Sequence, residues 1–388
     1  MKTKPFCAGF ASTATLAATA LFFVGLTGVN ASLILSANDE RVLYVDNQMT
    51  FVEEPGVGNV TLLDFSTFPP TAGTIHNVPV TVIGPPTCVA LVPGRPLAIL
   101  TSAMVTRKTD GDFRHEYDSR VALLDLRNGG KLIGLFETGL QPSGVAVTPD
   151  GAIAWLANRA EGTVSVMLIG EEKLVERAKT KIARETDSLS HVEISPDGRF
   201  GIATLTEAGG VLVLRIRGNG VPRVSDRLSS GGKPYAARFL PDGSGFVVAD
   251  IEKDEVLHYS FANGTARLQA RLPVGRIPEG IDVSPDGEWI AVSCFDGGNL
   301  TDPEHPKFGE PSRIYFLRRT EEGFSPAGAV EIDGAPQFAV FSADGRHLAV
   351  SNTGRQRLSF FELKDGGYVD TGHFLPLDGE PVAAVGSR

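Results

Sequence analysis

The sequence has few cysteines and no excess of positive charge. Only 3 of its 388 residues are cysteine, and 46 acidic residues outnumber 36 lysines and arginines, for a formal net charge of −10. Proteins that bind a nucleic-acid backbone present a basic face, so this charge argues against a nucleic-acid partner. The sequence also lacks a CxxCH haem motif and the His and Cys spacing of a copper site, so we expect no cofactor.

Long apolar runs are equally rare. The one run long enough to cross a membrane lies between the basic residues Lys2 and Lys4 and the small-residue tripeptide VNA at 29–31. This order predicts a secretory signal peptide over residues 1–31, with an uncleaved membrane anchor as the alternative. We therefore expect a periplasmic or extracellular protein whose residues 32–388 form one domain without a membrane span.

An exported protein can form disulfide bonds, but this one has few thiols for them. Cys88 and Cys294 are the two cysteines of the predicted mature chain. Two cysteines do not make a disulfide framework for a domain of this size. Two partly buried thiols are therefore favoured over a single bridge.

Repetition is the main positive feature of the sequence. Five segments share an alternating apolar run, a turn that contains Asp-Gly, and a second apolar run. They are PSGVAVTPDGAIAWLAN (142–158), LSHVEISPDGRFGIATL (189–205), PYAARFLPDGSGFVVAD (234–250), PEGIDVSPDGEWIAVSC (278–294) and PQFAVFSADGRHLAVSN (336–352). Two weaker copies precede them, ASLILSANDERVLYVDN (31–47) and PTCVALVPGRPLAILTS (86–102). The copies recur at roughly 50 residues, a period typical of propeller blades.

Each copy is followed by two more short apolar runs, such as GTVSVMLI (162–169). Four short strands in each of seven copies predict an all-β fold, a seven-bladed β-propeller with four-stranded antiparallel blades. In this fold the Asp-Gly pair forms the hairpin turn between the first two strands of a blade, so Ser195 beside it is not a nucleophile. The segment 380–388 also fits a first strand, which leaves open which terminus closes the ring.

The SPDG copies, with LANRAEGTVSVMLI (156–169) and SNTGRQRLSFFEL (351–363), resemble the YVTN-repeat and lactonase-like seven-bladed β-propeller superfamily. The resemblance extends over residues 32–388. It implies the fold more strongly than a function, because members include lactonases, subunits of cofactor enzymes and proteins without a known reaction.

The lactonase branch of this superfamily implies a set of site residues. Its members carry a His in one first strand, Pro-Arg-His at the start of the next blade, and a Glu in the blade after that. His191 matches the first of these residues. Tyr235 and Ala236 stand in place of the Arg and the His, and Gly280 stands in place of the Glu, with Glu279 one residue away.

Candidate channel residues follow from the alternation of side chains along the first strands, which line the channel of a propeller. We count back from the anchor residue, the one that precedes Asp-Gly. Positions two and four before it are mostly aliphatic, so positions three and five are predicted to face the channel. Most residues there are small or apolar. The charged exceptions come from adjacent blades and are candidate catalytic residues: His191, Glu193, Arg238 and Asp282.

These charged residues allow three interpretations. A His near carboxylates and a carboxylate near an Arg have shifted proton affinities, as is common at functional sites. The alternative is a structural ion network in which Glu193, Arg238 and Asp282 tie three blades together. A metal site is disfavoured, because the arginine lies between the two carboxylates, so we expect no metal.

The rim around the channel entry is the second candidate region. Loops between second and third strands lie there, and three of them are long: 47–59, 102–119 and 295–312. Insertions on a rigid scaffold often carry recognition. The acidic residues and histidines of these loops match no calcium-loop spacing, so solvated charged loops are favoured over a metal site. The ligand-binding candidates are Tyr235, Glu279, Arg159 and Asn158, and the candidate rim residues are Asp112, His115, Glu116, Asp302 and His305.

Together these features predict an exported, monomeric propeller that binds a protein partner or a small ligand through its rim and channel. A lactonase-like hydrolase that uses His191 and Arg238 is the alternative, and the missing lactonase residues place it second. An accessory subunit of a periplasmic redox enzyme is a third possibility, for which the sequence supplies no cofactor motif.

Overall fold

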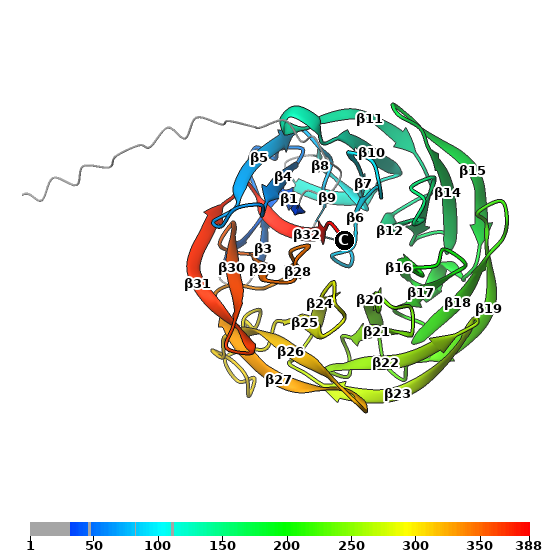
Figure 1. The fold of residues 1–388 in the computed structure, drawn as a ribbon. Coiled ribbons are helices and arrows are strands. Elements are labelled where there is room, and N and C mark those ends of the chain that lie inside the picture. The colour runs from blue at the N-terminus through cyan, green and yellow to red at the C-terminus, as the bar shows by residue number, and fades with distance from the viewer. Residues whose placement is uncertain (1–31, 46–47, 82, 110–111) are drawn as a thin grey trace, which may run out of the picture.

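A computed structural model describes residues 32–45, 48–81, 83–109 and 112–388, so the predicted signal peptide at 1–31 lies outside the described residues. The described chain forms a ring of seven four-stranded antiparallel sheets (Figure 1), which confirms the predicted seven-bladed β-propeller. Helix is limited in these residues to two 3-10 turns, η1 (Arg127–Gly129) and η2 (Glu185–Asp187). No described helix is long and apolar enough to cross a membrane.

In blades 2 to 7 the four strands follow the chain from the channel outwards. Blades 2, 3 and 4 consist of β6 (Val89–Leu91), β7 (Leu97–Thr101), β10 (Arg120–Asp125) and β11 (Lys131–Glu137); β12 (Pro142–Val147), β13 (Ile153–Asn158), β14 (Thr163–Ile169) and β15 (Leu174–Lys181); and β16 (Leu189–Ile194), β17 (Phe200–Leu205), β18 (Gly210–Ile216) and β19 (Pro222–Ser229). Blades 5, 6 and 7 consist of β20 (Pro234–Phe239), β21 (Gly245–Asp250), β22 (Glu255–Ala262) and β23 (Thr265–Pro273); β24 (Pro278–Val283), β25 (Trp289–Cys294), β26 (Ser312–Thr320) and β27 (Gly323–Ile332); and β28 (Ala339–Phe341), β29 (His347–Asn352), β30 (Arg357–Lys364) and β31 (Gly367–Pro376).

Blade 1 closes the ring by joining the two ends of the domain. Its strands, from the channel outwards, are β32 (Glu380–Gly386), β1 (Leu33–Asp39), β4 (Asn59–Asp64) and β5 (Thr71–His76). The C-terminal strand therefore takes the innermost place, and the end of the chain lies at the centre of the ring (Figure 1). The interpretation of 31–47 as a first-strand copy is wrong, because β1 is a second strand and its Ile34, predicted to face the channel, is fully buried.

The Asp-Gly segments are hairpin turns, as predicted. In the fourth blade the Ser195 hydroxyl donates to the Asp197 carboxylate at 2.6 Å, and that carboxylate accepts the Arg199 N–H at 3.0 Å. Gly198 has a φ of +67°, which favours glycine at this position. Ser195 thus holds the turn together, and the end of the channel beside these turns is called the turn end below.

Hairpins occupy two of the three predicted long loops. The first is β2–β3 (Val42–Val45 and Gln48–Phe51), so it begins before the predicted loop 47–59, and the second is β8–β9 (Met104–Thr109 and Asp112–Tyr117). They contact one another, since the rings of Phe51 and Phe113 stack at 5.2 Å. Both leave the ring at the end opposite the Asp-Gly turns, which is called the hairpin end below.

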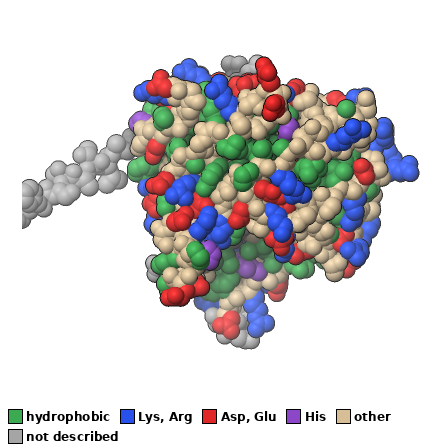
Figure 2. Space-filling model, turned by 90° about the horizontal axis from the view of Figure 1, so that it is seen from below, with side chains coloured by type: hydrophobic (Ala, Val, Ile, Leu, Met, Phe, Trp, Pro, Cys, Tyr) green, Lys and Arg blue, Asp and Glu red, His purple; other side chains and the backbone are tan. Residues whose placement is uncertain are grey.

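The core consists of apolar clusters between neighbouring blades, and the outer wall is charged. One cluster, for example, joins Trp155 of blade 3 to Leu212 of blade 4. Cys88 and Cys294 are buried in different clusters and both are free thiols, as the sequence favoured. Acidic and basic side chains are interspersed over the outer wall of the ring (Figure 2).

Candidate functional site

Three of the four predicted catalytic residues meet near the turn end of the channel. Arg238 Nη1 lies 3.2 Å from Glu193 Oε2, and Arg238 Nε lies 3.4 Å from Asp282 Oδ1. Asp282 also accepts the Phe341 N–H at 3.1 Å and pairs with Arg388. Burial acts to raise the pKa of Glu193, but Arg238, His191 and Arg388 together outweigh it and hold that pKa below its usual range. The predicted ion network is therefore present, and it joins blades 4, 5, 6 and 7.

The fourth residue, His191, does not face the channel. Its side chain is fully buried, and Nε2 lies 3.0 Å from the Ala237 carbonyl oxygen and 3.6 Å from Glu193 Oε2. A carbonyl only accepts, so Nε2 carries the proton, and Nδ1 has no partner among the described residues. Burial lowers the pKa of His191, so its imidazole is neutral at pH 7. His191 is a wall residue between blades.

His191 and Glu193 lie on the same regularly paired part of β16, so the burial of His191 comes from its place between Gly144 of blade 3 and Ala237 of blade 5. In β16, β20 and β24 the pairing with the second strand shifts before the third or fourth residue, so two consecutive residues face one partner. The shift reverses the alternation of side chains on one side of it. Residues five before the anchor, such as Ala236 and Phe338, pack in the interblade clusters.

Residues six before the anchor lie at the hairpin end of the first strands. In blades 2 to 7 every residue six before the anchor carries a hydrogen-bonding side chain, whereas most residues five before it are small or apolar. In blade 1 the corresponding residue is Val382. The six are Thr87, Ser143, Ser190, Tyr235, Glu279 and Gln337. We call them the polar ring. Sequence periodicity missed this set because an unbroken alternation of period two points it away from the channel.

Tyr235 and Glu279, both predicted ligand-binding residues, lie together in the polar ring. Glu279 is partly exposed, and the loss of solvent around it raises the pKa of its carboxyl to about 8, although Arg159 opposes the rise. Tyr235 is buried, which raises the pKa of its hydroxyl, although the nearby Arg159 opposes the rise. Tyr44 of the β2–β3 hairpin is close enough to Glu279 to feel its charge, and burial raises the pKa of Tyr44 to about 12. No pattern in the sequence marks Tyr44, because its hairpin approaches Glu279 only in the folded chain.

Several polar atoms of this ring have no protein partner. Thr87 Oγ1, Ser143 Oγ and Gln337 Oε1 are buried and make no hydrogen bond to any described residue. Buried polar groups in proteins are nearly always paired with protein or with ordered water. These atoms are therefore available to water or to a ligand inside the ring.

Asn158, the remaining ligand-binding candidate, is placed inside the blade. Its side chain is fully buried, and Nδ2 donates to Thr163 Oγ1 at 2.9 Å and to Ser165 Oγ at 3.0 Å. These bonds join the second and third strands of blade 3. Asn158 therefore holds the blade end, and its neighbour Arg159 is the residue that reaches the polar ring.

The predicted rim residues lie on the hairpin end but do not converge on one another. His115 packs against the Phe51 ring at 5.0 Å, and burial lowers its pKa. Glu116 pairs with Arg107 at 2.6 Å, while Asp112 is exposed. In the blade 6 loop, Asp302 and His305 each accept a backbone N–H from a residue two positions on. No group of three or more potential metal-ligating side chains occurs among the described residues.

The fold and this channel define the class of the protein, a seven-bladed β-propeller closed by its C-terminal strand. No family model and no curated protein matches the sequence. Among solved structures, the chain is similar to a proposed 6-phosphogluconolactonase from Bacteroides uniformis, with a TM-score of 0.70 and 18% identity over 92% of this chain and 99% of that one. It is also similar to the periplasmic gluconolactonase PpgL of Pseudomonas aeruginosa, with a TM-score of 0.67 and 16% identity over 92% and 99%. The resemblance to lactonase-like propellers is thus confirmed for the fold.

Proposed function

We propose that the protein is an exported propeller that binds a small, uncharged, hydroxyl-rich molecule in the polar ring. The observation that carries this proposal is the presence of hydrogen-bonding groups without protein partners at Thr87, Ser143 and Gln337. Burying such a group without a partner destabilises the folded protein by about 1–3 kcal/mol, unless water or a ligand pairs with the group. A molecule with several hydroxyl groups supplies both donors and acceptors to them.

The groups beside the polar ring donate hydrogen bonds, so they suit a ligand with hydroxyl or carbonyl oxygens. Glu279 is mostly protonated at pH 7, because its pKa is about 8, so it acts as a donor there rather than as an anion. Arg159 donates to Ser188 at 2.6 Å and is close enough to Tyr235 to lower the pKa of its hydroxyl. The Arg159 guanidinium therefore lies beside hydroxyl groups, and it can also donate a hydrogen bond to a neutral carbonyl or hydroxyl of the ligand.

Binding is tested by calorimetry with glucono-1,5-lactone and glucose as uncharged probes and gluconate as the charged one. We expect the uncharged probes to bind more tightly than gluconate at pH 6.5. Gln337→Ala should weaken binding by about tenfold, which corresponds to one lost hydrogen bond. Gln269→Ala on the exposed outer strand β23 is the matched control and should change nothing. Unchanged affinity in Gln337→Ala would contradict the proposal.

Hydrolysis of a lactone is the second candidate function, and the raised pKa of the partly exposed Glu279 favours it. In the ionised form its carboxylate can take a proton from water as the water oxygen attacks the lactone carbonyl. Arg159 would stabilise the oxygen that gains charge. The ring C–O bond then breaks, and the proton passes from Glu279 to the leaving alkoxide, so the product is the open hydroxy acid.

A pH-stat assay distinguishes hydrolysis from binding alone. Hydrolysis predicts a rate above the spontaneous one that rises with pH to a plateau above about pH 8 and is lost in Glu279→Gln. Binding alone predicts no excess rate at any pH. In that case Glu279→Gln should still bind the lactone, because its amide keeps a donor in place of the protonated carboxyl.

Export, a monomeric state and a protein partner at the rim are further parts of the proposal. The signal pattern at 1–31 and the similarity to a gluconolactonase named as periplasmic support export. Fractionation of cells tests the location, and light scattering of the purified protein tests the monomeric state. Co-purification from the cell envelope of protein with and without the β8–β9 hairpin tests the rim.

A further inference from the structure

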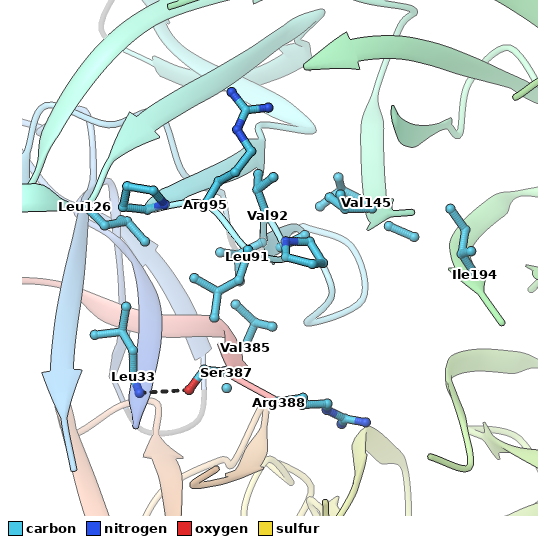
Figure 3. A pocket seen from close by; sticks show the side chains of 18 of the residues that line it. Leu33, Leu91, Val92, Arg95, Leu126, Val145, Ile194, Val385, Ser387 and Arg388 are labelled. Atoms are coloured by element: carbon cyan, nitrogen blue, oxygen red, sulfur yellow. Dashed lines mark hydrogen bonds between the residues drawn. The ribbon is translucent and has the colours of Figure 1, made fainter. Parts of the chain in front are cut away.

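The turn end of the channel contains a cavity of about 360 Å³ that is separate from the polar ring. The cavity is lined by residues three before the anchor, and the polar ring consists of residues six before it. Three residues along a strand span about 10 Å, which separates the two. Apolar side chains of blades 1 to 4 form one wall of the cavity (Figure 3). They include Leu33, Leu91, Val92, Val145, Ile194 and Val385. The volume lies in the range of roughly 300–1,000 Å³ that is usual for small-molecule pockets.

Charged side chains form the opposite wall, where Glu193 and Asp282 are matched by Arg238 and by Arg388, which points across the cavity in Figure 3. Two further arginines of the lining, Arg95 and Arg127, pair with Glu171 and Asp125 outside the cavity. An ion of either sign that entered would meet no opposite net charge to offset its loss of water, and burial of an unpaired ion is costly.

The charged wall has spare hydrogen-bonding groups among the described residues, including the donor Arg238 Nη2 and the acceptor Glu193 Oε1. Both oxygens of Asp282 are in use, by the two arginines and by the Phe341 N–H. Arg238 uses Nε and Nη1, and Nη2 bonds no described residue. Guanidinium groups only donate, so an acceptor on a molecule that fills the cavity can pair with Arg238 Nη2.

We propose that this cavity binds a small, mostly apolar molecule that carries one uncharged hydrogen-bond acceptor, such as a ketone, ester or lactone carbonyl. The apolar body lies against the wall of blades 1 to 4, where its contact with aliphatic side chains drives binding. The carbonyl oxygen accepts from the free guanidinium N–H groups. This site is independent of the polar ring and of the function proposed for it.

Three probes of equal length test the chemistry: 2-decanone, decanoate and decylamine, titrated calorimetrically into the purified protein at pH 7. We expect 2-decanone to bind at least about tenfold more tightly than either ion, because the ions lose hydration without a matching charge. Tighter binding of decanoate or of decylamine, or no binding of 2-decanone, would overturn the proposal.

Two substitutions test the location. Ala146 lines the cavity, so Ala146→Leu should reduce 2-decanone binding by about tenfold or more, whereas Ala152→Leu at an exposed turn of the same blade should not. Circular dichroism establishes that both variants fold. Arg388→Gln, which leaves the core intact, removes one positive charge and should shift the probe preference toward decylamine. If neither variant changes probe binding, the molecule binds elsewhere and the inference is wrong.

Discussion

The two ends of the central channel differ in how their polar groups are paired, although the same inner strands form both. At the turn end, Glu193 and Asp282 pair with Arg238 and Arg388, so the four charges cancel. At the hairpin end, Ser143 and Gln337 keep polar atoms without a protein partner. The comparison shows that charge in a channel does not by itself mark a reactive site: paired ions hold blades together, and unpaired neutral groups are the ones that can accept a polar ligand.

The largest expected effect follows from breaking the ion network. Arg238→Met should lower the free energy of unfolding by about 3–5 kcal/mol, because it leaves two buried carboxylates without their shared cation. Urea unfolding measures this. At the hairpin end, Gln337→Ala should cost about 1 kcal/mol or less, because the side-chain oxygen it removes has no protein partner. Equal losses in both variants would remove the distinction between the two ends.

Next in size is the effect of pH through Glu279. Its folded pKa of about 8 lies above its ordinary value of 4.5, so folding disfavours the ionised form. Stability should therefore be greatest below about pH 4.5 for this group and fall as pH rises to 8, by roughly 2–4 kcal/mol after allowance for its partial exposure. Glu279→Gln should flatten this slope in thermal unfolding at several pH values. The same slope in both proteins would show that another group causes it.

A smaller loss is expected from the wall that separates the two ends. A Cβ on Gly144 would lie 2.8 Å from the His191 Cα, which is backbone and cannot move aside freely. Gly144→Ala should therefore destabilise the protein by about 1–3 kcal/mol. Gly218→Ala is the matched control, because a Cβ there meets nothing within 4 Å. Denaturant midpoints that coincide for the two variants would contradict this tight contact.

The smallest effect is expected at the rim. Arg107 and Glu116 form an exposed ion pair at 2.6 Å on the β8–β9 hairpin, with side-chain exposures of 62% and 54%. Water and salt screen such pairs, so Arg107→Met should change the free energy of unfolding by less than about 1 kcal/mol. A loss comparable to that of Arg238→Met would mean that the hairpin is part of the core.

Sequence patterns predicted the architecture well because each blade repeats the same local signals. The Asp-Gly turn, with Ser195 and Gly198, and the alternation of apolar residues are properties of neighbouring residues, and the repeat multiplies them. The ion network was also predictable, since Glu193, Arg238 and Asp282 lie on the side of the bulge where alternation holds. Alternation placed His191 on the same face as Glu193, in agreement with their unbroken pairing, but it did not predict that packing between neighbouring blades buries His191.

The sequence by itself determined the number of blades, the four strands in each and the turns between them, because these depend on local spacing and turn chemistry. Only the tertiary structure decided which terminus lies innermost at the seam, since β32 and the first-strand pattern at 32–36 fit that place equally well as sequences. It also decided what faces the channel at the hairpin end. Bulges, and the approach of Tyr44 to the charge of Glu279, arise when distant segments pair and pack, and no short stretch of sequence records them.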